Sequence, residues 1–191
     1  MPRDSTDTRE RILKAADDLF YGEGIRAAGM DAIAAKAGVT KRTLYYHFRS
    51  KDDLIAAYLA ARDAPTIARF TRWVEEADGS LAEQVASMFR RTARFGVDGR
   101  WKGCGFQRAA AELAGAPGHP ALAVASAHKR GLEAWFTGRI AAAGLPEPGM
   151  KARQLIILLD GAVAQMLIHR DPAYAEAAAA AAGALLRPPS T

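Results

Sequence analysis

The sequence has few of the residues on which several common kinds of protein depend. Cysteine occurs once, at Cys104, which excludes an internal disulfide framework and argues against a cysteine-rich zinc site. A single cysteine is also usual for a reducing compartment, so the cytoplasm is favoured. Valine and isoleucine together number 15 against 43 alanines. Because this balance favours helix formers over strand formers, it argues against an all-β fold and against a parallel α/β sheet.

Signals for secretion or membrane insertion are also lacking. The first residues, MPRDSTDTRERILKAA, are charged throughout and hold no apolar stretch of the signal-peptide kind. The most apolar run, Leu155 to Ile168, is interrupted by Asp160 and Gln165 and is shorter than a bilayer requires. Half of the 191 residues are apolar and 25% are charged, which excludes a wholly disordered chain. We expect a soluble cytoplasmic protein with no membrane partner.

Groups for catalysis are scarce. The chain has four histidines and one cysteine, and these form neither a nucleophile–base pair nor a metal cluster at a recognisable spacing. An all-helical enzyme is therefore disfavoured, and we predict no enzymatic activity, no metal and no cofactor.

The net charge of +5 invites a nucleic-acid interpretation, but bulk charge does not locate a binding face. Residues 1–52 hold 10 basic and 8 acidic side chains, and residues 53–191 hold 16 and 13. The stretch from Lys41 to Lys51 differs from the rest because it is basic and contains no acid.

Apolar residues recur at helical spacing nearly everywhere and predict an all-α fold of about nine helices. The first helix has its apolar stripe at residues 12–20, with Ser5 or Thr6 as its cap and Gly22 and Gly24 at its end. Further helices are predicted over 30–37, after Thr40, after Ser50 (with Pro65 bending or dividing that helix), and over 81–97, 106–114, 120–143, 150–169 and 173–186.

Residues 30–48 have the layout of a helix-turn-helix, with a break at Gly38-Val39. On the second helix Leu44 and Phe48 can form the anchoring face, which leaves a basic, hydroxyl-bearing and aromatic face outside. Such a face suits the major groove, since Arg can contact a guanine edge, Thr a thymine methyl, and Tyr or Lys a phosphate. Thr40 adds a cap whose free backbone N–H groups could face a phosphate. The alternative is a short solvated helix without DNA function.

The stretch MDAIAAKAGVTKRTLYYHFRSKDDLIAAYL resembles the DNA-binding motif of the TetR family of bacterial transcriptional regulators. The matching elements are an "IA..AGV" first helix and turn, a "TLY.HF" recognition helix and an "SK..L" entry to the next helix. TRERILKAADDLFYGEGI resembles the first helix of the family, so the likeness covers residues 8–60.

The resemblance implies roles for particular residues. Thr40 would cap the recognition helix, Lys41, Arg42 and Thr43 would meet base edges, and the remaining predicted DNA contacts would hold phosphates: Tyr45, Tyr46, His47 and Lys51. Arg42 departs from the small residue or proline common at its place. It gives this chain either a sharper guanine preference or one more phosphate contact.

The resemblance also implies two domains, a DNA-binding domain over residues 1–52 and a helical effector-binding and dimerisation domain over residues 53–191. The helix predicted over 150–169 is apolar nearly all round, and the last helix has alanines on several faces. Pairing of residues 150–186 with a second copy would cover both helices. Burial of both helices within one subunit is the alternative.

A mostly apolar pocket with a few polar groups is the usual form of a small-molecule site. The candidate ligand-binding residues are Phe89, Phe95, Trp101, Cys104, Gln107, His128, Trp135, Asp160 and Gln165, with Phe106 and His169 in the same region. Each has a simpler interpretation: the aromatic residues as ordinary core, His128 on a solvated face, and Asp160 paired with an arginine across a dimer.

Cys104 lies in WKGCGFQRAAAEL, which resembles a "GC.F…A.EL" segment found in a subset of the family, where some members sense electrophiles or oxidants through a cysteine. A helix N-terminus with Lys102 nearby could activate such a thiol. A small buried residue between two glycines is the competing interpretation.

The sequence thus predicts a ligand-responsive, sequence-specific transcriptional regulator, a repressor that a small-molecule effector releases from its palindromic operator. The alternatives are a redox sensor acting through Cys104 and a constitutive DNA-binding protein. The sequence does not identify the effector, the operator or the regulated genes.

Overall fold

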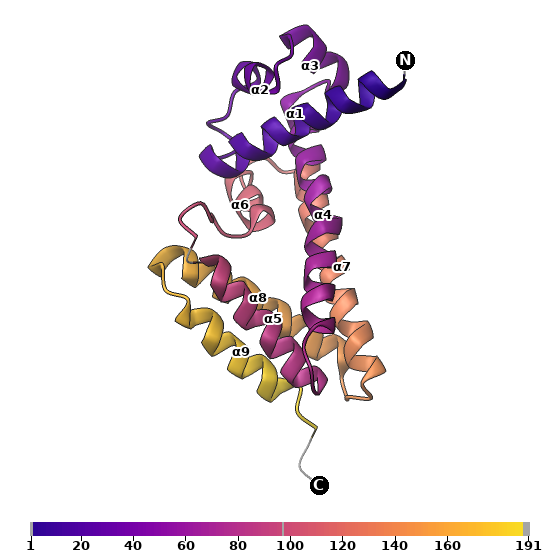
Figure 1. The fold of residues 1–191 in the computed structure, drawn as a ribbon, viewed down its shortest axis with the longest axis vertical. Helices are drawn as coiled ribbons and strands as arrows, with labels where there is room; N and C mark the ends of the chain where they lie inside the picture. The colour runs from indigo at the N-terminus through magenta and orange to yellow at the C-terminus, as the bar shows by residue number, and fades with distance from the viewer. Residues whose placement is uncertain (1, 97, 189–191) are drawn as a thin grey trace. The chain divides into compact units, whose positions relative to one another are not determined.

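The computed structural model describes residues 2–96 and 98–188, apart from the side chains of residues 2–4 and 95. Within these residues the chain forms nine α-helices and no strand (Figure 1), which confirms the predicted all-α fold. The helices are α1 (Pro2–Glu23), α2 (Met30–Ala37), α3 (Lys41–His47), α4 (Lys51–Glu75), α5 (Leu81–Gly96), α6 (Gly105–Glu112), α7 (Pro120–Ala142), α8 (Pro148–His169) and α9 (Ala173–Leu185).

The chain is built as two compact units. The first is Met1–Asp63 with Gly105–Ser126, and the second is Ala64–Cys104 with Ala127–Thr191. The division falls inside α4 and α7 because the first half of α4, through Leu54 and Leu59, is buried in the first unit. The predicted domains, 1–52 and 53–191, have their boundary at the end of the sequence motif, whereas the two compact units are defined by the contacts within them. The predicted boundary therefore stays a prediction about which part of the chain serves which function.

Several helices begin where their capping residues predict. The Thr40 hydroxyl accepts a hydrogen bond from the Thr43 backbone N–H at 3.1 Å, and the Ser50 hydroxyl accepts one from the Asp53 N–H at 3.0 Å. At the start of α5 the Ser80 N–H donates to the Glu83 carboxylate at 2.7 Å, which completes a capping box. These bonds satisfy backbone groups that helix starts leave without partners.

One local prediction is wrong, and one of the two alternatives for Pro65 is excluded. The first helix is not capped by Ser5 or Thr6 but begins at Pro2, because proline fits the first turn, where its missing N–H has no helical partner. Pro65 does not divide its helix, since α4 runs unbroken from Lys51 to Glu75. Buried residues on both sides of Pro65, including Leu59 and Phe70, hold α4 in helical form despite the lost hydrogen bond.

The core of the first unit joins α1 to α4. Ile12 and Phe20 of α1 are buried, and the Phe20 ring meets the Tyr58 ring edge-on with centroids 5.4 Å apart. The Arg62 guanidinium, which pairs with Asp17, lies over the Tyr58 ring at 5.6 Å. The helices that carry the predicted motif therefore stand on a packed base.

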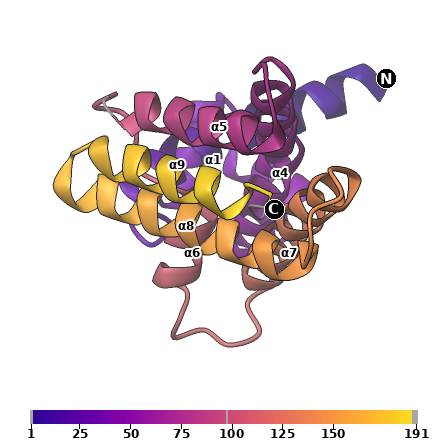
Figure 2. The same ribbon diagram turned by 90° about the horizontal axis from the view of Figure 1, so that it is seen from below.

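In the second unit α5, α8 and α9 lie side by side (Figure 2). The buried face of α9 consists of alanines, among them Ala178 and Ala182. A Cβ placed on Gly183 would lie 3.6 Å from the Cβ of Ala86 on α5, so the two helices approach closely. Alanine is therefore used here for close helix packing within one chain.

Helix α8 is the one described helix that is long and apolar enough, by length and composition, to cross a membrane. Its inner face, which includes Leu155, Leu159 and Met166, packs in the core of the second unit. Its Asp160 carboxylate forms an ion pair with Lys129 of α7 at 2.5 Å. These contacts are those of a core helix.

Tyr58 predicts how stability depends on alkaline pH. Burial raises the pKa of Tyr58 from 10.0 to about 12, although the nearby Arg62 guanidinium acts in the opposite direction. Because the folded chain holds this proton more tightly, the stabilisation is complete below pH 10 and is lost as the pH rises toward 12. Relative to Tyr58→Phe, the wild type should lose about 2 kcal/mol of unfolding free energy over this range. Denaturant titrations of both proteins at each pH measure this, and a constant difference would contradict the burial of the phenol.

Candidate nucleic-acid interface

The α2–α3 segment forms the predicted helix-turn-helix. Gly38 ends α2 in the left-handed region with φ 64°, and the Val39 N–H donates to the Ala34 carbonyl at 3.0 Å. Thr40 is the N-cap of α3, which begins at Lys41. The turn therefore consists of three residues, and Gly38 supplies the conformation that reverses the chain.

Arg11 of α1 fixes this turn from the side. Its Nη2 donates to the carbonyls of Ala37 and Gly38, at 2.8 and 3.0 Å. These carbonyls lie at the C-terminal end of α2, where a cation is favoured. Arg11 was not among the predicted site residues, because nothing in its spacing connects it with a turn 26 residues away.

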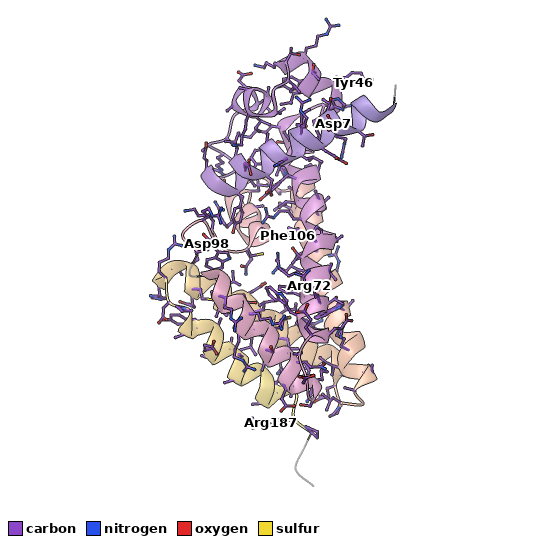
Figure 3. The ribbon with its side chains drawn as sticks, viewed as in Figure 1. Asp7, Tyr46, Arg72, Asp98, Phe106 and Arg187 are labelled. Atoms are coloured by element: carbon purple, nitrogen blue, oxygen red, sulfur yellow. The ribbon has the colours of Figure 1, made fainter. Side chains whose placement is uncertain are left out.

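The rotation of α3 about its axis is set by two buried residues. Leu44 is 0% exposed and Phe48, which ends α3 as its cap, is 4% exposed under the Arg9 guanidinium. On the opposite side the Tyr46 side chain is 82% exposed (Figure 3). The predicted anchoring face and outward face are both confirmed.

The two basic side chains at the start of α3 are held differently. Arg42 is exposed, and within the described residues no ion pair restrains it. The Lys41 ammonium, by contrast, lies 2.8 and 3.1 Å from the two carboxylate oxygens of Asp31 on α2. This hydrogen bond with Asp31 raises the pKa of Lys41. The stretch from Lys41 to Lys51 contains no acidic residue, but in the fold the carboxylate of Asp31 on the neighbouring helix lies beside Lys41.

Other side chains that are predicted to contact DNA also contact neighbouring residues of this chain. The Thr43 and Thr40 hydroxyls lie 2.8 Å apart, and the His47 ring meets the Tyr46 ring edge-on at 5.3 Å. Tyr45 is 40% exposed on the flank. The predicted DNA-binding residues thus gather at α3 and the start of α4, and their contacts with DNA stay a prediction.

Lys51, at the start of α4, donates through Nζ to the Arg26 carbonyl at 3.3 Å. Arg26 is in turn held by Glu112 of α6: its N–H donates to the Glu112 carboxylate at 3.1 Å and its Nε to the Glu112 carbonyl at 3.0 Å. Arg108 of α6 adds a 2.7 Å bond to the Tyr21 carbonyl. Helix α6 is therefore bound to the end of α1 and to the connection before α2.

The predicted ligand-binding residues do not all fall in one unit. Phe89 is fully buried in the core of the second unit, and other members pack against that core: Trp101, Cys104 and Trp135. Gln107 lies on α6 in the first unit, together with the buried Phe106 labelled in Figure 3. The Phe95 side chain lies outside the described residues. These placements leave the ligand site a prediction.

The polar candidates have distinct surroundings. His128 is buried rather than on a solvated face. Asp160 has its partner, Lys129, in the same chain, so an arginine from another subunit is not needed to pair it. Gln165 and His169 are exposed on α8. Cys104 is half-buried directly before α6, and its role as a sensor stays a prediction.

A packed base of α1 and α4, a glycine turn and a short helix with one basic, aromatic outer face define a helix-turn-helix protein of the DNA-binding class. Comparisons of sequence specify it further. The model of the family described as "Bacterial regulatory proteins, tetR family" matches residues 12–58, and that of "Tetracyclin repressor-like, C-terminal domain" matches residues 105–188.

Over nearly all of its length the chain is similar to SCO4454, a TetR-family transcriptional regulator from Streptomyces coelicolor. The identity is 33%, the match covers 95% of each chain, and the TM-score is 0.82. The chain therefore belongs to the TetR family of bacterial transcriptional regulators. Because members of this family are regulators and not enzymes, the all-helical enzyme is excluded.

Curated relatives match shorter stretches of the chain. The transcriptional regulator SrpR of Pseudomonas putida is 41% identical over 68 residues, which is 36% of this chain and 32% of SrpR. The transcriptional activator FasR of Mycolicibacterium smegmatis is 49% identical over 59 residues, which is 31% of this chain and 26% of FasR. The chain thus matches about a third or less of the length of these two relatives.

Gly38 supplies a test of the turn geometry. An alanine there would adopt φ 64°, and its Cβ would lie 3.3 Å from Arg11 Nη2. We expect Gly38→Ala to lower the unfolding free energy by about 1–2 kcal/mol, because L-residues are strained in this region. Gly22→Ala is the control, since its Cβ would meet nothing within 4 Å, and it should leave stability unchanged or raise it by up to about 1 kcal/mol. Chemical denaturation compares the two, and equal effects would contradict the strained turn.

Proposed function

We propose that the protein is a dimeric regulator that binds a palindromic operator through α3 and responds to a small molecule in its C-terminal domain. The observation that carries the proposal is the fixed rotation of α3, with Leu44 buried and Tyr46 82% exposed. A recognition helix must present the same side chains to every operator copy, and this packing supports that requirement.

The chemistry of the outer face supports reading of the major groove. The free Arg42 guanidinium can donate to O6 and N7 of a guanine, and Thr43 can contact a thymine methyl. The phenols of Tyr45 and Tyr46 and the ammonium of Lys51 can donate to phosphates, which position the helix without reading sequence. Arg42 is the residue on which we expect base preference to depend most.

Dimerisation through α8 and α9 is supported by what these helices leave uncovered. Ile157 and Ile168 of α8 are 65% and 69% exposed, and they continue a stripe with Gly161 and Gln165 at helical spacing. On α9 the side opposite the buried alanines is also alanine-rich, including Ala177 and Ala181. A second copy placed on this surface by a two-fold axis would cover both stripes.

The coupling between effector and DNA runs, in this proposal, through α4 and α6. Helix α4 begins at Lys51 and continues to Glu75, so it joins the two functional regions covalently. Helix α6 opens the match to the C-terminal family model, yet Glu112 and Arg108 bond it to the DNA-binding unit. An effector that favours another placement of these helices would change the spacing of the recognition helices.

The direction of regulation depends on where the operator lies. We propose repression in the cytoplasm, with release by the effector, as the sequence predicts. Similarity in sequence does not decide this, since one relative, FasR, is named as an activator.

Operator binding tests the proposal directly. In gel shifts on the DNA that flanks its own gene, across a salt series and with unrelated DNA as competitor, the wild type should form a sequence-specific complex. Arg42→Ala with Tyr46→Ala should weaken this complex by about 10- to 100-fold, because a bidentate base contact and a phosphate contact are lost.

The matched control is Arg90→Ala, which removes the same charge from an exposed position on α5. It should leave specific binding close to the wild type. The absence of a specific complex, or equal binding by the double variant and the wild type, would contradict the proposal.

The dimer makes a separate prediction. Ile157→Glu places a carboxylate at the proposed interface, and two-fold symmetry introduces it twice. Because a buried carboxylate without a partner is costly, the dimer should dissociate at least about tenfold more readily, as sedimentation at several concentrations measures. Ala134→Glu, at an exposed position on α7, is the control. A wild-type protein that sediments as a monomer at every concentration would contradict the proposed interface.

A further inference from the structure

Lys41 and Asp31 form a close contact between the two helices of the motif. Asp31 lies in the first turn of α2 and Lys41 in the first turn of α3. The ammonium is 2.8 Å from one carboxylate oxygen and 3.1 Å from the other. Both side chains are largely exposed, as is the neighbouring Arg42.

We infer that Asp31 is a specificity-determining residue, which holds Lys41 toward a base edge and away from the DNA backbone. The inference rests on the proposed function and adds to it an acidic residue that no phosphate contact would require. Asp31 acts through Lys41 and through its own charge, so it is a positioning residue.

The number of donors on an ammonium explains the effect. Lys41 has three N–H donors, and the carboxylate of Asp31 engages up to two of them. The remaining donor has a restricted direction, whereas an unrestrained lysine is a point charge on a flexible stem that finds any nearby phosphate. A donor of fixed direction can distinguish a guanine O6 or N7 from other base edges.

The charge of Asp31 has the complementary effect. Non-specific binding depends almost wholly on neutralising phosphates, so a carboxylate beside the recognition helix weakens it and reduces its salt dependence. Specific binding recovers part of this loss through the base contact of Lys41. Asp31 thereby widens the difference between operator and other DNA, which is how repulsive elements create specificity.

A similar pair in the same unit provides a matched control. Lys36 of α2 and Asp18 of α1 lie 3.3 Å apart and are about half exposed, but Lys36, unlike Lys41, is not a predicted DNA contact. Asp18→Asn removes the same charge and the same kind of surface ion pair as Asp31→Asn. A difference between the two variants therefore reports the position of Asp31 and not the loss of one carboxylate.

The experiment uses the full chain and two duplexes. One is selected by the wild type from a random pool, and the other is a scrambled duplex of the same composition. Fluorescence anisotropy across a salt series gives the dissociation constants, the ratio between the duplexes and the salt slope. We expect Asp31→Asn to bind the scrambled duplex about two- to fivefold more tightly, with a slope steeper by about 0.9, and to show a smaller ratio.

Lys41 provides the internal check. In a Lys41→Gln background the Asp31→Asn change should still strengthen binding to both duplexes through the lost charge, but it should leave the ratio between them nearly unchanged, because the residue through which Asp31 sets the base contact is gone. Asp18→Asn should match the wild type. Thermal melting establishes that each variant is folded, and Asp31→Ala replaces Asp31→Asn if the latter is not.

A failure of this inference can be distinguished from a failure of the proposed function. If the wild type selects no sequence from the pool, the proposed function falls and this inference falls with it. If the wild type selects an operator but Asp31→Asn strengthens both duplexes equally, or changes their ratio just as much in the Lys41→Gln background, the inference is wrong and the proposed function stands.

Discussion

Burial of Leu44 and Phe48 is the constraint on which the outer face of this protein depends. With both side chains held in the core of the first unit, α3 can present only one of its sides, and that side carries Arg42 and Tyr46. Helix α3 has seven residues and could not hold this orientation by its own hydrogen bonds. The fixed turn at Gly38, bonded by Arg11, serves the same end, because it sets where α3 begins.

Ion pairs and hydrogen bonds then determine how the cationic side chains on this exposed side are held. Cations that form one basic stretch in the sequence are held differently in the structure: Lys41 by Asp31, Lys51 by the Arg26 carbonyl, and Arg42 by no ion pair among the described residues. A contact restrained in this way has a defined direction, and a free one adapts to the backbone of its target. The same network reaches α6 through Glu112, so the state of that helix and the position of Lys51 are physically linked.

Interactions between residues close in the sequence could be predicted, and interactions between residues far apart in the sequence could not. Thr40 and Ser50 reveal their helix starts because a cap acts within three residues, and Leu44 reveals its buried side because helical spacing is local. The bond between Arg26 and Glu112 joins residues 86 positions apart, and no periodicity marks it. Pro65 does not divide α4 for a related reason, since packing on both sides of it outweighs its local preference to end a helix. Candidate pocket residues chosen by type alone were likewise divided, with Gln107 in one unit and Phe89 in the other.

The central claim is that the outer side of α3 is the surface that meets DNA. Amide hydrogen exchange of the full chain, with and without a duplex that it selects, tests this most directly because it reports every helix at once. The account predicts slowed exchange concentrated in the turn after Gly38, in α3 and at the start of α4 around Lys51. Unchanged exchange in these segments, with protection confined to other helices such as α5 or α8, would contradict it.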